Sequence, residues 1–305
     1  MDILNIKNIS KSYVGHKALD DISIDIKKSS IFGLLGPNGA GKTSLIRIVN
    51  QIINQDQGKI LLNGNKITYD DVRKIGYMPE ERGLYKKMKV GDFLLFMGKL
   101  KGLNRNKCID SSRDWFNHLE VSNWWKKNIE DLSKGMSQKV QFISTVLHNP
   151  DLIILDEPFS GFDPINANLV KKNLLRLKEE GKTIIFSTHR MESVDELCDH
   201  LAMINKSRKI LDGNTDLIKM NSKSENYLIT HNKKLNPNKN LFEIINSEEV
   251  SKNIYESEVV LRSGNKSRDL IVEISNYTEI ISFKQKIPNM NDIFIMKVKE
   301  GGNYE

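Results

Sequence analysis

A glycine-rich segment near the start of the chain has the residues and spacing of a loop that holds polyphosphates. It runs Gly36, Pro37, Asn38, Gly39, Ala40, Gly41, Lys42, Thr43, Ser44, and its first eight residues fit the pattern G-x-x-x-x-G-K-[ST]. The glycines let the backbone curl and point N–H groups at phosphate oxygens. Lys42 supplies a positive charge for the β- and γ-phosphates, and the Thr43 hydroxyl is a ligand for Mg²⁺. The segment predicts binding of a nucleotide, without indicating the reaction.

Elements with two different periodicities surround this loop. Residues 31–35 form a short continuous apolar run, typical of a buried parallel strand, and residues 44–49 follow with helical spacing. The start of a helix adds further N–H groups and the favourable end of its dipole. Similar apolar runs occur at 152–155 and 183–187, with helical segments between the runs. Strands that alternate with helices predict an α/β fold with a parallel sheet flanked by helices.

Polar side chains follow the two later apolar runs. Asp156 and Glu157 come directly after residues 152–155, and His189 follows Thr188 at the end of the next run. Because the carboxyl ends of parallel strands meet at one edge of a sheet, these side chains are expected near the phosphate loop. Asp156 is then a ligand of Mg²⁺, Glu157 a general base that polarises the attacking water, and His189 a hydrogen-bonding partner of the γ-phosphate. Taken singly, Glu157 could instead be a capping or surface carboxylate, and a lone histidine is more often structural.

A short motif lies between the phosphate loop and the Asp156 strand. Residues 132–138 read Leu-Ser-Lys-Gly-Met-Ser-Gln. The motif resembles the LSGGQ signature of ATP-binding cassette (ABC) proteins, and the other motifs follow in that family's order. The resemblance covers residues 3–217. It implies a P-loop NTPase with a RecA-like parallel core, an antiparallel β subdomain and a helical subdomain at about 88–150. It also implies ATP hydrolysis, with ATP and Mg²⁺ as cofactors.

The resemblance further implies that two cassettes work as a pair, with a homodimer expected. Each ATP would lie between the phosphate loop of one subunit and the signature of the other, here Ser133, Lys134, Gly135 and Met136. A serine at a helix start and an exposed glycine N–H suit contact with a phosphate. Lys134 and Met136 depart from the family pattern, in which glycine and glutamine are usual.

Three further positions carry the resemblance. Tyr13 stands where the family has an aromatic ring that stacks on adenine, and Asp163 matches the D-loop residue that bridges the subunits. Glu80 occupies the place of the Q-loop glutamine and is expected to ligate Mg²⁺. Residues 79–85 and 281–294 resemble the ATPase subunits of type-2 ABC exporters, especially those of sodium-extrusion systems.

The amino-acid composition of the sequence changes after about residue 217. Residues 219–240 are rich in Asn, Lys and Ser, which indicates a boundary. Strands are expected at 227–230, 258–262, 269–274 and 280–286, and a helix at 291–299. The sequence thus predicts a nucleotide-binding domain at 1–217 and a small α+β extension at 218–305. For the extension, packing that stabilises a dimer is favoured over a sensory or interaction role.

Composition limits the class of protein. The chain has 305 residues, a net charge of +7 and two cysteines, Cys108 and Cys198, whose spacing suits neither a disulfide framework nor a zinc site. The sequence contains no apolar run of about 18 residues, so no membrane span is predicted. The first residues do not have the pattern of a signal peptide. The positive charge could reflect nucleic acid, an anionic membrane face or solubility. Lysines scattered among acidic residues favour solubility.

Together these features favour the ATPase subunit of an ABC transporter, by resemblance an exporter, that powers a separate integral membrane permease. Such a subunit would be cytoplasmic, held on the cytoplasmic face of the cell membrane by its permease. The alternative is a soluble ABC ATPase acting on ribosomes or nucleic acid. Translation factors of this superfamily normally carry two cassettes, whereas one phosphate loop is present here, and residues 43–133 leave no room for the coiled coil of DNA-repair relatives. No nucleic-acid partner is therefore expected.

Overall fold

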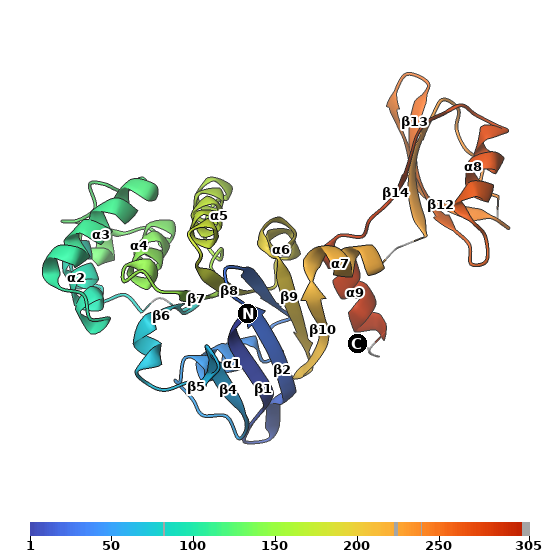
Figure 1. Cartoon of the computed structure of the whole chain (residues 1–305). Helices are drawn as coiled ribbons and strands as arrows, with labels where there is room; N and C mark the ends of the chain where they lie inside the picture. Colours follow the sequence, from blue (N-terminus) through green and yellow to red (C-terminus); the bar gives the residue numbers. More distant parts are fainter. Residues whose placement is uncertain (82, 223–224, 239, 301–305) are drawn as a thin grey trace. The chain divides into compact units, whose positions relative to one another are not determined.

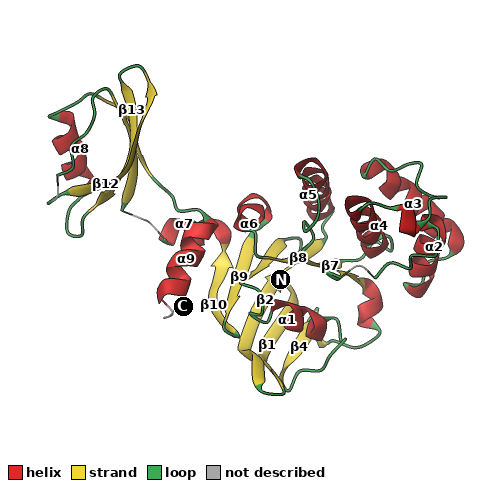
Figure 2. Ribbon diagram, turned by 180° about the vertical axis from the view of Figure 1, so that it is seen from behind, coloured by secondary structure: helices red, strands yellow, loops and turns green. Residues whose placement is uncertain are grey.

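The chain folds as two units, each with its own hydrophobic core. In the computed structural model, residues 1–81, 83–222, 225–238 and 240–300 are described. Among the described residues, one unit comprises Met1–Thr215 together with residues 297–300, and the other comprises Asp216–Met296. Their elements are labelled in Figure 1, and Figure 2 gives the view from behind. Within the described ranges, no helix combines the length and apolar character that crossing a bilayer requires.

A six-stranded sheet forms the centre of the first unit. Its order is β10–β9–β3–β8–β7–β6, in which β10 pairs antiparallel with β9 and the other neighbours pair parallel. The strands are β3 (Ile31–Leu35), β6 (Ile75–Met78), β7 (Leu152–Asp156), β8 (Thr183–Thr188), β9 (His200–Asn205) and β10 (Arg208–Asn214). Every residue of β3, β7 and β8 is buried, as expected of parallel strands covered on both faces. The predicted α/β fold with a parallel core is confirmed.

An antiparallel sheet packs against this core. Its order is β2–β1–β4–β5, formed by β1 (Asp2–Tyr13), β2 (His16–Lys27), β4 (Gln57–Leu62) and β5 (Asn65–Lys66). The alternating apolar residues Ile22, Ile24 and Ile26 are all buried, whereas Asp25 is exposed. They share one core cluster with Phe32 of β3 and with residues of α1 (Lys42–Val49). The apolar face of β2 therefore holds the antiparallel sheet on the parallel core, as period-2 alternation predicts.

Helices fill most of the chain between β6 and β7. They are α2 (Val90–Leu100), α3 (Arg105–His118) and α4 (Lys134–Val146), with the short 3-10 helix η2 (Ile129–Asp131) between the last two. Both views show these helices gathered at the β6 edge of the sheet (Figure 1, Figure 2). The helices α5 (Pro164–Glu179) and α6 (Met191–Leu197) follow β7 and β8, and η1 (Asp71–Lys74) precedes β6. The helical stretch expected from the sequence is thus present.

The backbone of α4 approaches β6 at Gly76. An ideal Cβ at Gly76 would lie 2.5 Å from the carbonyl oxygen of Thr145 and 3.0 Å from Cγ of Pro150. We expect Gly76→Ala to lower the free energy of unfolding by about 1–3 kcal/mol, because the added methyl group must push α4 away from the sheet. Denaturant titration followed by circular dichroism measures the loss. Gly83→Ala is the matched control, since its Cβ would meet nothing within 4 Å, and equal stability of the two variants would contradict the prediction.

The second unit contains a four-stranded antiparallel sheet. Its order is β12–β13–β11–β14, formed by β11 (Asn226–His231), β12 (Phe242–Ser251), β13 (Ile254–Leu261) and β14 (Ile280–Gln285). The helix α8 (Ser267–Ser275) covers one face, where Leu270 and Ile274 join the core residues of β11 and β13. The helices α7 (Thr215–Asn221) and α9 (Met290–Glu300) lie at the two ends of this part of the chain. The predicted α+β character is present.

One predicted strand is wrong: residues 269–274 belong to the helix α8. The run Leu-Ile-Val-Glu-Ile is rich in β-branched residues, which favours a strand by local preference. In the structure Leu270 and Ile274 are buried, whereas Ile271 and Val272 are exposed, which is the spacing of one helix face. The N–H of Lys266 also donates to the carboxylate of Asp269 at 3.1 Å, a contact that closes the start of the helix. Burial on the sheet therefore overrides local preference.

Candidate active site

A cavity of ≈ 410 Å³ lies where β3, β7 and β8 end. It is lined by Tyr13, His16, Ala18, Asn38, Gly39, Ala40, Gly41, Lys42, Thr43, Ser44, Glu80, Asp156, Glu157, Ser160 and His189. Most of the residues that the sequence singles out are thus brought together at the carboxyl edge of the parallel sheet. This is the edge where α/β folds bind their ligands.

The phosphate loop links β3 to α1. Gly41 has φ +113, and an ideal Cβ there would lie 2.3 Å from the carbonyl oxygen of Ala18, so glycine is required. Residues 38–44 line the cavity, whereas Gly36 and Pro37 are not among the described lining residues. The carbonyl groups of Gly36 and Pro37 instead face the Lys42 side chain. The loop therefore presents its second half and the start of α1 to a ligand.

The ammonium group of Lys42 is held inside this loop. Its Nζ donates to the carbonyl oxygens of Gly36 at 2.7 Å and of Pro37 at 3.1 Å, and the residue is only 6% exposed. Burial lowers the pKa of Lys42, and the nearby carboxylates of Glu157, Asp156 and Glu80 act in the opposite direction. A positive charge thus stands opposite carboxylates across one cavity.

The side chains after β7 are fixed by β8. The hydroxyl of Ser187 donates to a carboxylate oxygen of Asp156, and the N–H of Glu157 donates to the carbonyl oxygen of Ser187 at 3.2 Å. Oε1 of Glu157 lies 2.8 Å from Nδ1 of His189, and the Thr188 hydroxyl is 3.4 Å from Oε2. Glu157 adopts φ +50, a left-handed conformation that is uncommon for a residue other than glycine. Such conformations concentrate at functional sites, where surrounding contacts hold them.

The hairpin between β1 and β2 forms the opposite wall of the cavity. Tyr13 ends β1, His16 begins β2, and both line the cavity. The ring of Tyr13 is partly exposed, and Nζ of Lys11 lies 5.7 Å from its centroid. An exposed aromatic face at this wall is suited to stacking on a planar base.

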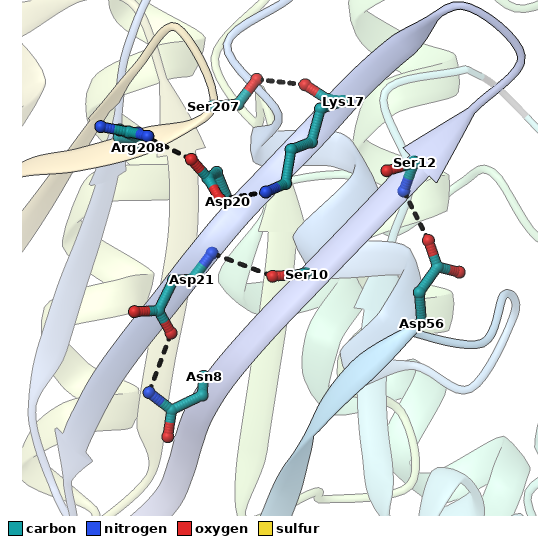
Figure 3. Close-up of polar contacts among 9 residues, drawn as sticks. All are labelled: Asn8, Ser10, Ser12, Lys17, Asp20, Asp21, Asp56, Ser207 and Arg208. Carbon is teal, nitrogen blue, oxygen red and sulfur yellow. Dashed lines mark hydrogen bonds and ion pairs between the residues drawn. The ribbon is translucent and has the colours of Figure 1, made fainter.

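Polar contacts hold this hairpin to the parallel sheet (Figure 3). The Ser207 hydroxyl, in the turn between β9 and β10, donates to the Lys17 carbonyl at 2.5 Å, and its own carbonyl accepts from the Asp20 N–H at 2.9 Å. Nε of Arg208 donates to the Asp20 carboxylate at 2.7 Å. The hydrogen bond from Lys17, followed by that from Arg208, lowers the pKa of Asp20. Figure 3 also shows the Asp21 N–H on the Ser10 hydroxyl, which joins β2 to β1. The first half of β2, which follows Tyr13 in this hairpin, is therefore tied to the turn between β9 and β10.

The signature residues lie apart from the nucleotide-sized cavity. Ser133 is the N-cap of α4, and its hydroxyl accepts from the Met136 N–H at 3.3 Å. Ser133, Lys134, Gly135 and Met136 are not among the described residues that line the first cavity. Lys134 lines a second cavity of ≈ 280 Å³ together with Glu80, Glu81, Gln138, Gln141 and Ser160. Within one chain, the signature thus does not face the phosphate loop's cavity.

Two other predicted features have a local structural role. Asp163 is the N-cap of α5, and its carboxylate accepts from the Asn166 N–H at 3.0 Å, which lowers the pKa of Asp163. The exporter-like stretch 79–85 includes Arg82, which lies outside the described residues. Pro79 and Glu81 beside it accept hydrogen bonds from the amide of Gln141 through their carbonyl groups, at 2.8 and 3.4 Å. These bonds hold the segment after β6 against α4.

Some lining residues escape sequence reasoning. His16, Ala18 and Ser160 line the cavity, and Ser187 and Thr188 contact its acidic residues, but the sequence motifs assign none of these five side chains a role. The place of Ser160 in the site could have been inferred from the sequence, because this residue follows Asp156 and Glu157 after a short turn. No local sequence feature marks His16 and Ala18 as site residues, since the packing of the antiparallel sheet brings them to the cavity.

Family models match both parts of the chain. Residues 19–160 match a model described as ABC transporter, and residues 213–298 match the C-terminal domain of proteins like the ATP-binding protein DrrA1-3. An uncharacterized ABC transporter ATP-binding protein, YhaQ of Bacillus subtilis, is 37% identical over 303 residues, which are 99% of this chain and 100% of that protein.

Relatives with a more specific name cover the first unit. The linearmycin resistance ATP-binding protein LnrL of Bacillus subtilis is 34% identical over 70% of each chain. The lantibiotic transport ATP-binding protein SrtF of Streptococcus pyogenes is 30% identical over 70% of this chain and 92% of that protein. None of these names refers to ribosomes, nucleic acid or sodium, so the ribosome alternative gains no support.

A solved structure, the ATP-binding subunit of an ABC transporter, matches with a TM-score of 0.67 and 26% identity over 72% of this chain and 92% of that chain. The fold found here agrees with that likeness. The chain belongs to the ATP-binding subunits of ABC transporters, a family of cassettes that hydrolyse ATP.

Proposed function

We propose that this subunit hydrolyses ATP in the cavity at the ends of β3, β7 and β8, and that it powers export through a separate membrane permease. The juxtaposition of Lys42, Asp156, Glu157 and His189 in one cavity carries the proposal for the site. The names of LnrL and SrtF, resistance and lantibiotic transport, support export as the direction. The nucleotide-binding domain is proposed to be residues 1–217 and the appended domain residues 218–305.

The cavity offers contacts to each part of ATP. Tyr13 is proposed to stack on adenine from the β1–β2 hairpin. The N–H groups of residues 38–44 surround the phosphates, with help from the start of α1. Lys42 donates to the β- and γ-phosphates once it leaves the carbonyl groups that it now contacts.

The oxygen donors of this cavity suit Mg²⁺. Thr43, Glu80 and Asp156 all line it and supply one hydroxyl and two carboxylates, the hard ligands that Mg²⁺ prefers. The Ser187 hydroxyl orients the Asp156 carboxylate by donating to it. We propose these three residues as the ligands, directly or through water. When bound, the ion neutralises charge on the β- and γ-phosphates.

Glu157 is proposed as the general base. The residue is 8% exposed, and its carboxylate lies between His189 and Thr188, which limit how far it can turn. It accepts a proton from the water that attacks the γ-phosphate, and the γ-phosphate leaves ADP as the new bond to water oxygen forms. His189, more exposed than Glu157, is proposed to hold both Glu157 and the γ-phosphate.

The separation of the signature from the cavity supports pairing of two cassettes, most simply a homodimer. Ser133, Lys134, Gly135 and Met136 would then contact ATP held by the partner, and Asp163 would lie at the joint between them. Hydrolysis removes the γ-phosphate that joins the two surfaces, so that the two cassettes can move apart after the chemical step.

The proposed association with a membrane permease can be tested by measuring where the subunit is located and how fast it hydrolyses ATP. Co-expressed with its membrane permease, the subunit is expected in the membrane fraction on the cytoplasmic face, and its ATP turnover should rise when permease is present in lipid vesicles. The Glu157→Gln subunit serves as control, because it should reach the membrane without turnover. A wild-type subunit that stays out of the membrane fraction and hydrolyses ATP equally well without the permease would contradict the proposal.

A further inference from the structure

The end of β1 that carries Tyr13 extends beyond the strand that flanks it. The ladder between β1 and β4 ends where Ser10 pairs with Gln57, whereas β1 itself continues to Tyr13. A backbone N–H group at the end of a strand still needs an acceptor. The N–H of Ser12 therefore depends on an acceptor from outside the ladder.

Asp56, the residue just before β4, supplies this acceptor. Its Oδ2 accepts from the Ser12 N–H at 2.7 Å, and its own N–H donates to the Ser10 carbonyl oxygen at 2.9 Å. Its Oδ1 accepts from Nζ of Lys11 at 2.7 Å. The hydrogen bond from Lys11, followed by that from the Ser12 N–H, lowers the pKa of Asp56, so the carboxylate is charged at neutral pH. One carboxylate thus fixes the backbone next to Tyr13 and the side chain two residues before it.

Lys11 in turn contacts the ring of Tyr13. Side chains two residues apart on a strand project from the same face, and Nζ of Lys11 lies over the Tyr13 ring, 5.7 Å from its centroid. At this distance an ammonium group is attracted to the electron-rich face of the ring. Tyr13 lines the first cavity, whereas Lys11 is not among the described residues that line it. The ammonium group therefore covers one face of the ring, which leaves the other face for a planar base.

The opposite arm of the hairpin is held as well, as Figure 3 shows. The Ser207 hydroxyl donates to the Lys17 carbonyl oxygen at 2.5 Å, so β2 is fixed at Lys17 in the same way that β1 is fixed at Ser12. Only residues 13–16 lie between these two contacts. Val14, at the tip, is fully exposed. The orientation of the aromatic ring in this short segment therefore depends on how the two arms are held.

We propose that Asp56 is a positioning residue for the nucleotide base: by fixing the Ser12 N–H and the Lys11 ammonium group, it holds the Tyr13 ring in the orientation that stacks on adenine. Without the Asp56 carboxylate the ring samples other orientations, and ordering it on binding offsets part of the stacking. This role of Asp56 rests on the stacking of Tyr13 on adenine proposed above.

Charge and ring orientation make different predictions for two variants. ATP is an anion, so by charge alone Asp56→Ala should strengthen its binding and Lys11→Ala should weaken it. If the orientation of the ring decides, both variants should weaken binding. The side chain of Asp56 is 43% exposed, so its long-range effect on the nucleotide is screened by salt, which favours the second outcome.

The test measures binding of MgATP by calorimetric titration. Tyr13→Ala removes the whole stacking contact and should weaken binding by about tenfold, whereas Asp56→Ala and Lys11→Ala should each weaken it by about three- to fivefold. In the Tyr13→Ala background, adding Asp56→Ala should change the affinity by less than about 1.5-fold, because Asp56 acts through the ring. Inorganic tripolyphosphate with Mg²⁺, which has no base, should bind every variant within about twofold of wild type. In steady-state hydrolysis, Asp56→Ala should raise KM for ATP and leave kcat within about twofold.

Asp25→Ala is the matched control. Asp25 also accepts from a side chain of β1 at 2.7 Å, Nδ2 of Asn5, but this contact lies away from the tip of the hairpin. The control should bind ATP as wild type does, and a thermal melt of each variant shows that binding is measured on folded protein. Wild-type affinity of Asp56→Ala for ATP, or an equal loss with tripolyphosphate or in the Tyr13→Ala background, would overturn the positioning role of Asp56 alone. Wild-type affinity of Tyr13→Ala would instead overturn the stacking on which that role rests.

Discussion

Lys42→Ala is expected to abolish most of the affinity for ATP. The ammonium group of Lys42 is buried beside Glu157, Asp156 and Glu80, whose carboxylates it offsets. Without it, three carboxylates would face an incoming polyphosphate with no opposing side-chain charge at the loop. Truncating one member of a buried charged contact costs about 2–5 kcal/mol, which corresponds to an affinity lower by roughly 30-fold to several thousand-fold.

Calorimetric titration with ATP measures this loss. Lys59→Ala is the matched control, because Lys59 is an exposed lysine of β4 that is not among the described residues lining the cavity. A thermal melt of both variants separates lost binding from lost folding, since Lys42 also bonds the carbonyl groups of Gly36 and Pro37. If a folded Lys42→Ala protein bound ATP as tightly as wild type, the role of the phosphate loop would be wrong.

Glu157→Gln is expected to stop turnover while leaving ATP binding intact. Glutamine has the shape of glutamate and keeps one oxygen, which can accept one of the two contacts that His189 and Thr188 make with separate carboxylate oxygens. It cannot accept the proton of the attacking water. We expect the turnover number to fall by about 10²- to 10⁴-fold, the usual contribution of a general base. Because ATP then persists at the interface, a dimer should accumulate.

Phosphate release gives the turnover, and light scattering after size-exclusion chromatography gives the mass with and without ATP. Glu179→Gln, at an exposed position that ends α5, is the control and should behave as wild type. Normal hydrolysis by the Glu157→Gln protein would assign the general base elsewhere. A catalytically inactive protein that stays monomeric with ATP would retain the base and contradict the pairing.

Much of the candidate site follows from the order of strands and polar residues. Asp156, Glu157 and His189 each stand just after an apolar run, Lys42 follows another run through the phosphate loop, and parallel strands end at one edge of their sheet. Their convergence could therefore be predicted without coordinates. The helix α8 could not be predicted in this way, because the apolar run at 269–274 suits both a strand and a helix until the segments that pack against it are known.

Other features depend on contacts between distant segments. The Ser207 hydroxyl that holds the Tyr13 hairpin bonds a carbonyl group 190 residues earlier in the chain. Nothing in either local sequence marks that contact, so the wall formed by Tyr13 and His16 appears only in the folded chain. The same holds for Ser187, whose hydroxyl orients Asp156 across neighbouring strands.

The phosphate loop, the acidic strand end, the family and the reaction can all be predicted from the amino-acid sequence. These are encoded in short motifs, because a local backbone path and a few side chains suffice to bind phosphate. Only the folded chain shows that Glu80 and Lys134 line one cavity, and that the signature residues are not among the described residues lining the phosphate loop's cavity. The same holds for Gln138 Oε1, which has no hydrogen-bond partner in the described part of the chain. Such relations arise from how α4 packs beside β6, and packing depends on the whole core rather than on any single motif.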